Sequence, residues 1–179
     1  DFTGVPVHIG DYEPGFNAVE AASEFVLGVR DTTGLPQGSG LFEGTPMAMA
    51  GQMSGGFYPQ IAAPSSSVWV DVRAPSGTTQ DELENHMDAV AARSIHSSRS
   101  SWRRTTLGYA PAYSMASVAI PLFETLENVF VEVTGNVLKR GCANPGNRFF
   151  FTDAAHLEAG GIPSLVFGPG EWVPGPDEK

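Results

Sequence analysis

The sequence is poor in cysteine and in positive charge, and both shortages narrow the range of possible functions. Its 179 residues contain one cysteine, Cys142, so the chain forms no internal disulfide and builds no metal site from several thiolates. Ten basic residues stand against twenty acidic ones, which gives a formal net charge of −10. This charge repels the phosphates of nucleic acids and anionic membrane surfaces, so we expect small molecules or other proteins as partners.

Long apolar runs are also missing from the sequence. No stretch of about 18 apolar residues is present that would cross a membrane, and no basic segment followed by an apolar one marks a signal peptide. We therefore expect a soluble, cytoplasmic protein. The chain starts at Asp1 without a methionine and stops at Lys179, just after a turn-like Pro-Gly-Pro-Asp-Glu segment, which we interpret as the ends of a fragment.

Two amphipathic helices are predicted in the first part of the chain. Asn17, with Glu20 three residues later, has the spacing of a capping box and predicts a helix that ends near Arg30. Thr79 and Glu82 repeat this spacing and predict a second helix that ends before the polar stretch 97–101. In each segment the apolar residues recur on one helical face: Ala18, Ala22, Phe25, Val26 and Val29 in the first, and Leu83, Met87, Val90 and Ala91 in the second.

Four strands are predicted around these helices. The clearest is residues 68–73, where valines alternate with Trp69, Asp71 and Arg73 at the period of two that is typical of a strand. Further strands are expected around Thr3–His8, Met47–Ala50 and Arg103–Tyr109. Two helices interleaved with about four strands indicate one layer of helices on an antiparallel sheet, the ferredoxin-like arrangement of the α+β class.

The pattern changes after Pro111, and we predict a domain boundary near residue 112. A third apolar stripe starts at Pro121 and stops at Gly135, which predicts another helix, and a loop rich in Gly, Asn and Pro follows at 141–147. A short helix capped by Thr152 or Asp153 and an apolar strand at 164–167 complete the segment. A strand that is apolar on both sides is typical of a parallel sheet covered by helices, so residues 113–179 are predicted to be an α/β piece.

Several segments resemble a known family of enzymes. The stretch 152–170 is similar to the end of the catalytic domain, and residues 176–178 continue this likeness. Residues 55–73 are similar to the family's lid segment, and residues 15–18 resemble the start of the lid helix. The family is that of acetylornithine deacetylase, succinyl-diaminopimelate desuccinylase and carboxypeptidase-G-like proteins, which are zinc amidohydrolases and peptidases. The matches occur in the family's order and cover nearly the whole chain.

The resemblance implies a two-domain enzyme in which the larger domain holds two zinc ions and the lid pairs two subunits. Residues 1–112 would be the dimerisation lid, and residues 113–179 the C-terminal segment of the catalytic domain. In such enzymes the metals polarise the scissile carbonyl and prepare a bridging water, while a glutamate moves the proton. Most metal ligands would precede Asp1, and the last one aligns with Pro174, which cannot coordinate a metal. We therefore assign no metal ligand to this chain.

The resemblance singles out two residues of the lid. His8 lies where the family keeps a histidine that reaches across the dimer to the carbonyl oxygen of the substrate and stabilises an oxyanion. The alternative is an ordinary loop histidine. Gln60 lies where many members carry an asparagine that contacts substrate across the dimer, and it keeps the amide on a side chain one methylene longer.

Four further residues are candidates for binding substrate. Arg73 offers a guanidinium to a substrate carboxylate, as in some members of the family, but it can equally pair with a neighbouring aspartate. Thr152, Gly168 and Gly170 would bind substrate through a hydroxyl and backbone groups. The alternative for these three is a helix cap and a strand-ending turn, which the local sequence requires in any case.

Three hypotheses about function follow. The first is a metal-dependent hydrolase that cleaves amide bonds of N-acyl amino acids or small peptides as a homodimer, with most metal ligands outside this chain. The second is a non-catalytic dimerisation or ligand-binding module derived from that family, and Pro174 supports it. The third, an unrelated ferredoxin-like regulatory domain, explains the first half but leaves the stretch 152–170 unexplained.

Overall fold

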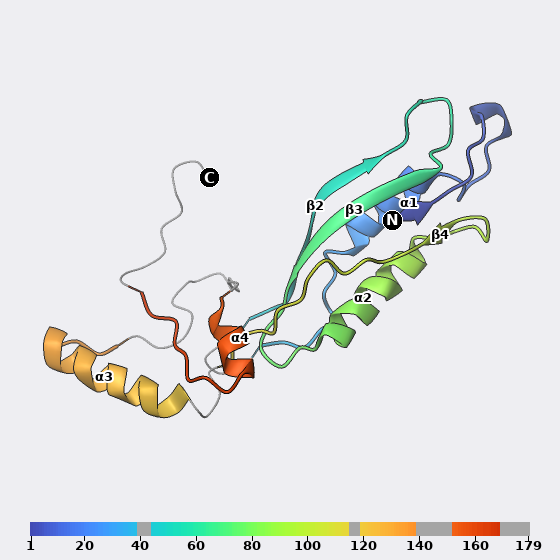
Figure 1. The fold of residues 1–179 in the computed structure, drawn as a ribbon. Helices are drawn as coiled ribbons and strands as arrows, with labels where there is room; N and C mark the ends of the chain where they lie inside the picture. The colour runs from blue at the N-terminus through green and yellow to red at the C-terminus, as the bar shows by residue number, and fades with distance from the viewer. Residues whose placement is uncertain (39–43, 115–118, 139–151, 169–179) are drawn as a thin grey trace. The chain divides into compact units, whose positions relative to one another are not determined.

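The computed structural model describes residues 1–38, 44–114, 119–138 and 152–168 (Figure 1). The chain divides into two compact units. The first contains Asp1–Leu35, Pro46–Arg73 and Thr79–Tyr109, and the second contains Pro36–Thr45, Ala74–Thr78 and Ala110–Lys179.

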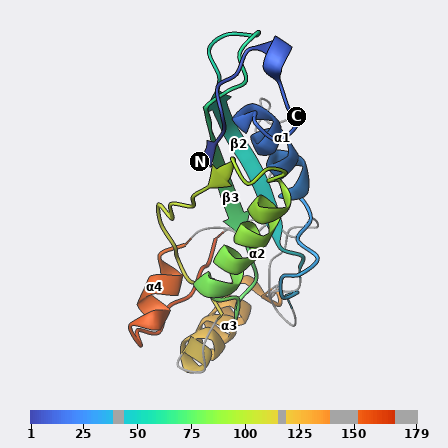
Figure 2. The same cartoon turned by 90° about the vertical axis from the view of Figure 1, so that its right-hand side faces the viewer.

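The first unit is a four-stranded antiparallel sheet with two helices. Its strands lie in the order β2-β3-β1-β4, and the element order along the chain is the ferredoxin-like β-α-β-β-α-β. Figure 2 shows both helices in front of the sheet, on the same face. The predicted α+β fold of this segment is therefore confirmed. The element bounds are β1 Phe2–Thr3, α1 Ala18–Gly28, β2 Met47–Gly55, β3 Ser65–Arg73, α2 Gln80–Arg93 and β4 Ser101–Trp102.

The core of the first unit lies between the sheet and the helices, where the predicted apolar stripes meet. The rings of Phe2 on β1 and Phe25 on α1 are 5.5 Å apart between centroids. Small side chains let α1 approach the sheet closely, since Ala22 is fully buried. The remaining members of the buried cluster are Ala18, Ala21, Val29, Ala63, Val90 and Ala91. Burial of these apolar surfaces is the main force that holds the two layers together.

The helix caps follow the predicted spacing, with one difference. Thr79 and Glu82 form the full capping box: the Glu82 amide donates to Thr79 Oγ1 at 3.2 Å, and the Thr79 amide donates to Glu82 Oε2 at 2.8 Å. Asn17 Oδ1 accepts from the amide of Val19 at 3.1 Å and so caps α1. Glu20, however, accepts a hydrogen bond from the side-chain Nδ2 of Asn17 at 3.2 Å and not from its backbone amide. The first cap is therefore not a reciprocal capping box.

Three predicted strands differ from those in the structure. The strand expected at Thr3–His8 is limited to β1, and the one expected at Met47–Ala50 extends to Gly55, with a shift of register after Ala50. The strand predicted at Arg103–Tyr109 is wrong. Pairing ends just after β4, where the Arg103 amide donates to the Asp1 carbonyl at 2.9 Å and the N-terminal ammonium of Asp1 donates to the Arg103 carbonyl at 3.0 Å. The side chain of Arg104 then turns toward α2.

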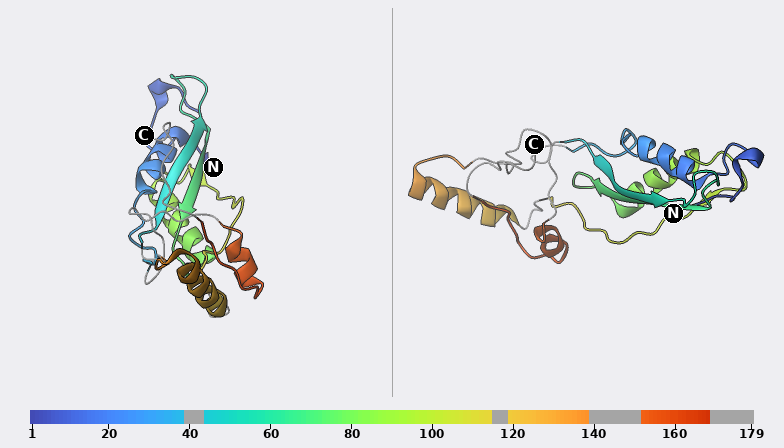
Figure 3. Two further views of the ribbon diagram at one scale, coloured as in Figure 1. Left: turned by 90° about the vertical axis from the view of Figure 1, so that its left-hand side faces the viewer. Right: turned by 90° about the horizontal axis from the view of Figure 1, so that it is seen from above.

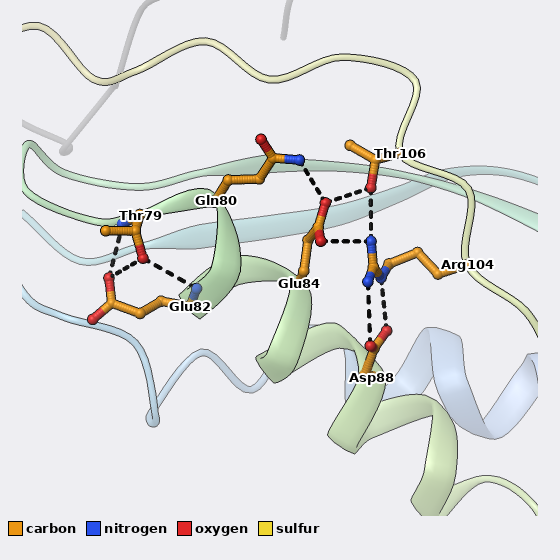
Figure 4. Close-up of polar contacts among 7 residues, drawn as sticks. All are labelled: Thr79, Gln80, Glu82, Glu84, Asp88, Arg104 and Thr106. Carbon is orange, nitrogen blue, oxygen red and sulfur yellow. Dashed lines mark hydrogen bonds and ion pairs between the residues drawn. The ribbon is translucent and has the colours of Figure 1, made fainter.

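The segment that follows β4 is attached to α2 by Arg104 (Figure 4). Its guanidinium lies 2.8 Å from Glu84 Oε2 and donates through Nε to Asp88 Oδ1 at 2.8 Å. Thr106 accepts from Arg104 Nη1 at 2.9 Å and donates to Glu84 Oε1 at 2.7 Å. The pKa of Glu84 is lowered, first by the hydrogen bond from Gln80 and then by the one from Thr106. Because the folded-state pKa is depressed, this stabilisation is present at neutral pH and is lost as the pH falls through that pKa.

Replacing Arg104 with methionine should lower the free energy of unfolding by about 0.5 kcal/mol, since the network joins two half-exposed ion pairs of a few tenths each. The loss should shrink in 1 M salt, which screens the pairs. Urea unfolding at low and high salt measures both effects. Arg103→Met is the matched control, because the side chain of Arg103 is 81% exposed and its Nη2 lies 3.8 Å from Asp1 Oδ2. Equal losses for the two variants would refute the role of this network.

The second unit contains helices α3 (Ile120–Thr134) and α4 (Ala154–Ala159). Gly135 ends α3 in the left-handed conformation with φ 68°, as predicted. The predicted strand at 164–167 is wrong: these residues belong to no helix or strand, although the Tyr113 hydroxyl donates to the Ser164 carbonyl at 2.7 Å. A buried strand needs neighbouring strands, and none of the described segments of this unit pairs with it. The predicted loop at 141–147 lies outside the described residues.

None of the described residues of α3 is buried. Its apolar side chains are half-exposed or exposed, with Val133 at 77%, and the ring of Phe130 contacts Phe167 at 6.2 Å between centroids. A helix with this much apolar surface normally packs against other elements. Among the described helices of the chain, none is both long enough and apolar enough to cross a lipid bilayer.

Candidate functional site

Two of the predicted site residues, His8 and Gln60, are brought together at one end of the first unit. The amide of Ile9 donates to the Gln60 carbonyl at 2.9 Å, and the amide of Ala62 donates to the Val7 carbonyl at 2.9 Å. His8 and Ile61 form an isolated antiparallel bridge between the two loops. Figures 1 and 2 show the N-terminal loop and the β2–β3 loop side by side beyond the end of the sheet. We call these two loops, residues 5–12 and 56–63, the tip.

The imidazole of His8 is exposed, and one of its nitrogens is already engaged. Its Nδ1 accepts from the amide of Gly10 at 3.2 Å and caps the short 3-10 helix η1 (Ile9–Asp11). A nitrogen that accepts a hydrogen bond carries no proton, so the neutral ring holds its proton on Nε2. The Nε2–H binds no partner among the described residues, so it is a donor that can stabilise an oxyanion or bind a carbonyl oxygen.

The polar groups of the tip lie among exposed apolar side chains. Ile9 is 65% exposed, Phe57 is 65% exposed and Tyr58 is 61% exposed. The rings of Phe57 and Tyr58 contact each other edge to face at 5.2 Å. Gln60 is exposed beside them. Such a mixture of aromatic side chains and a few polar groups is typical of a surface that contacts a ligand or another protein.

Arg73 lies far from the tip and is paired with its neighbour on the strand. Its Nη2 is 2.8 Å from Asp71 Oδ2, and its Nε donates to the same carboxylate at 2.8 and 3.1 Å. The hydrogen bond to Asp71 raises the pKa of Arg73. β3 starts beside the tip and runs from Ser65 to Arg73, so its two ends are about 26 Å apart at 3.3 Å per residue. Within one chain, Arg73 and His8 do not contact the same small molecule.

The remaining candidates belong to the second unit. Thr152 Oγ1 accepts from the amide of Ala154 at 3.3 Å at the start of α4, while Asp153 makes no capping bond through its side chain. Gly168 is exposed, and a Cβ added there would meet nothing within 4 Å. Gly170 lies outside the described residues. Thr152 therefore acts as a local helix cap, and the side-chain position of Gly168 has no close neighbours among the described residues.

No metal centre is assembled by the part of the chain that the structure describes. No group of three or more His, Cys, Asp or Glu residues lies close enough together there to hold an ion. Cys142 and Pro174 lie outside this part.

The chain matches a known protein family. Residues 1–98 match the peptidase dimerisation domain. This match covers more than half of the chain, so the chain belongs to this family, and the membership of the peptidase and amidohydrolase family predicted from its motifs is confirmed. No curated protein matches the sequence.

A solved structure has the same fold. The chain is similar to the aminobenzoyl-glutamate utilization protein from Klebsiella pneumoniae, with a TM-score of 0.57 and 23% sequence identity. The alignment covers 88% of this chain and 38% of that protein. The chain thus spans well under half the length of this neighbour, and at this identity the likeness supports the fold alone.

Proposed function

We propose that the chain is the dimerisation lid, residues 1–112, and a C-terminal segment of the catalytic domain, residues 113–179, of a metal-dependent hydrolase. Its substrates would be N-acyl amino acids or small peptides with a scissile amide bond. The family match over residues 1–98 supports the lid. The observation that carries the proposal is the tip, where backbone hydrogen bonds pair the loop of Gln60 with the loop of His8 and the imidazole of His8 is exposed.

His8 would act on the partner subunit's substrate. Its Nε2–H would donate to the carbonyl oxygen as that atom becomes negative, while Gln60 would hold a polar group of the same substrate. Arg73 would bind a substrate carboxylate only after release from Asp71, with which it is paired. Thr152, Gly168 and Gly170 would contribute a hydroxyl and backbone groups from the second unit.

The homodimer is proposed to form through β2, a long strand at the edge of the sheet. Figure 3 shows β2 beside β3, and the strand order leaves the other side of β2 without a partner strand among the described residues. Met49 on this strand is 62% exposed. An open edge offers backbone donors and acceptors to a second strand, so two copies can extend one sheet across the dimer.

The family's two zinc ions do not fit the described residues, which assemble no group of three ligands. We propose that most ligands lie outside this chain. After dialysis against zinc, the purified chain should therefore bind well under one ion per polypeptide, which elemental analysis measures. Two tightly held ions per chain would contradict this proposal.

A second candidate is a non-catalytic dimerisation or ligand-binding module. Pro174, at the position of the last metal ligand, favours it. Elemental analysis of a longer form of the protein separates the two candidates. Two zinc ions per longer polypeptide support the hydrolase, and none supports the module.

A further inference from the structure

We propose that Tyr12, Asn17 and Glu20 form a brace that positions His8 and Gln60, so that these three are positioning residues for the proposed reaction. This inference rests on the proposed function of the tip. None of the three is assigned to substrate. Their side chains join both loops of the tip to the start of α1.

Asn17 attaches the loop of Gln60 to α1. Its Oδ1 accepts two backbone amides, from Val19 at 3.1 Å within α1 and from Ala63 at 3.2 Å in the other loop. The side chain is half-buried. Capping α1 requires only the first of these bonds. The second fixes the backbone three residues after Gln60, and it is reinforced by the bond from the Ala18 amide to the Ala63 carbonyl at 3.0 Å.

Glu20 and Tyr12 attach the loop of His8 to the same point. One oxygen of Glu20 accepts from Asn17 Nδ2 at 3.2 Å, and the other accepts from the Tyr12 hydroxyl in a short hydrogen bond. Tyr12 directly follows η1, and its amide donates to the Ile9 carbonyl at 3.4 Å. Tyr12, at the C-terminal end of η1, therefore attaches the short helix that His8 caps to Glu20.

The Tyr12 hydroxyl remains a donor over the whole physiological pH range. Its hydrogen bond to Glu20 raises the pKa of Tyr12 to about 12, since the neighbouring carboxylate disfavours a second negative charge. The brace thus runs without interruption from Tyr12 through Glu20 and Asn17 to Ala63. Ordering an exposed loop costs backbone entropy, and the side-chain bonds of the brace add to the backbone bonds between the two loops in keeping them in one arrangement.

The test is nuclear magnetic resonance of the whole 179-residue chain, which needs no activity. The ring nitrogens of His8 report its tautomer, and the amides of Ile9 and Ala62 report the two bonds between the loops. Tyr12→Phe removes only the hydroxyl, and Asn17→Asp keeps a capping oxygen but loses the donor to Glu20. We expect at least tenfold faster exchange of both amides in each variant, and a rise in the Nδ1–H tautomer of His8.

The matched control is Ser23→Ala, which removes a hydrogen bond of 2.7 Å to the Val19 carbonyl on the same helix but touches neither loop. Exchange at the tip should stay within twofold of wild type in this control. Unchanged tip signals in either brace variant, or equal changes in the control, would overturn the inference. If Asn17→Asp fails to fold, Tyr12→Phe alone decides. A negative result leaves the role of His8 intact, because that role is tested separately by kinetics.

Discussion

Replacing Gly4 with alanine should lower the free energy of unfolding of the lid by on the order of 3 kcal/mol, the upper end for a forced steric overlap. A Cβ on this residue would lie 2.2 Å from the Phe16 carbonyl oxygen, 2.6 Å from the Ala63 carbonyl oxygen and 2.8 Å from the Ala18 amide nitrogen. All three neighbours are backbone atoms, which cannot rotate away as a side chain would. Urea unfolding followed by circular dichroism measures the loss.

The close backbone contacts around Gly4 also hold the tip in place. The Gly4 amide donates to the Pro64 carbonyl at 2.9 Å, and the Val5 amide donates to the Phe16 carbonyl at 2.8 Å. The matched control is Gly108→Ala, where an added Cβ would meet nothing within 4 Å. This control should unfold within about 0.5 kcal/mol of wild type. If the two variants were equally stable, the close approach at Gly4 would be wrong.

For the proposed hydrolase, replacing His8 with glutamine should lower kcat by about 10²–10³, the usual loss of one oxyanion donor. The KM should change little, because the bond to Nε2–H strengthens only as the carbonyl oxygen becomes negative. Steady-state kinetics on an N-acyl amino acid, with dimerisation checked in parallel, separates this effect from loss of the subunit pair.

His96→Gln is the control for this second variant. His96 is exposed and pairs with Glu24 on α1, away from the tip. Its replacement should leave kcat within twofold of wild type. A His8 variant that keeps more than half of the wild-type kcat would show that this residue is an ordinary loop histidine.

Local patterns predicted the helices well because caps and apolar stripes are set by neighbouring residues. Thr79 with Glu82 and Asn17 with α1 are such cases, since their partners lie within three positions. Strands depend on distant partners. The segment Arg103–Tyr109 has an acceptable strand pattern, but Arg104 binds two carboxylates on α2 and the sheet ends at β4. The apolar segment 164–167 likewise has no partner strand among the described residues.

The candidate site shows the same division. The resemblance indicates His8 and Gln60 one at a time, and only the backbone pairing of two loops 52 positions apart in the chain brings their loops together. The Arg73–Asp71 pair was one of two predicted alternatives, because residues two apart on a strand share a face. The Tyr12–Glu20 bond was missed, since a spacing of eight matches no local capping motif.

Sedimentation equilibrium tests most directly whether this chain pairs with a second copy of itself through β2, as proposed. We expect a species of twice the 18.9 kDa chain mass at micromolar concentration. Met49→Lys should shift it to monomer, because two lysines on adjoining edges repel, whereas Leu27→Lys on α1, 72% exposed, should not. A wild-type chain that stays monomeric at high micromolar concentration would contradict the claim.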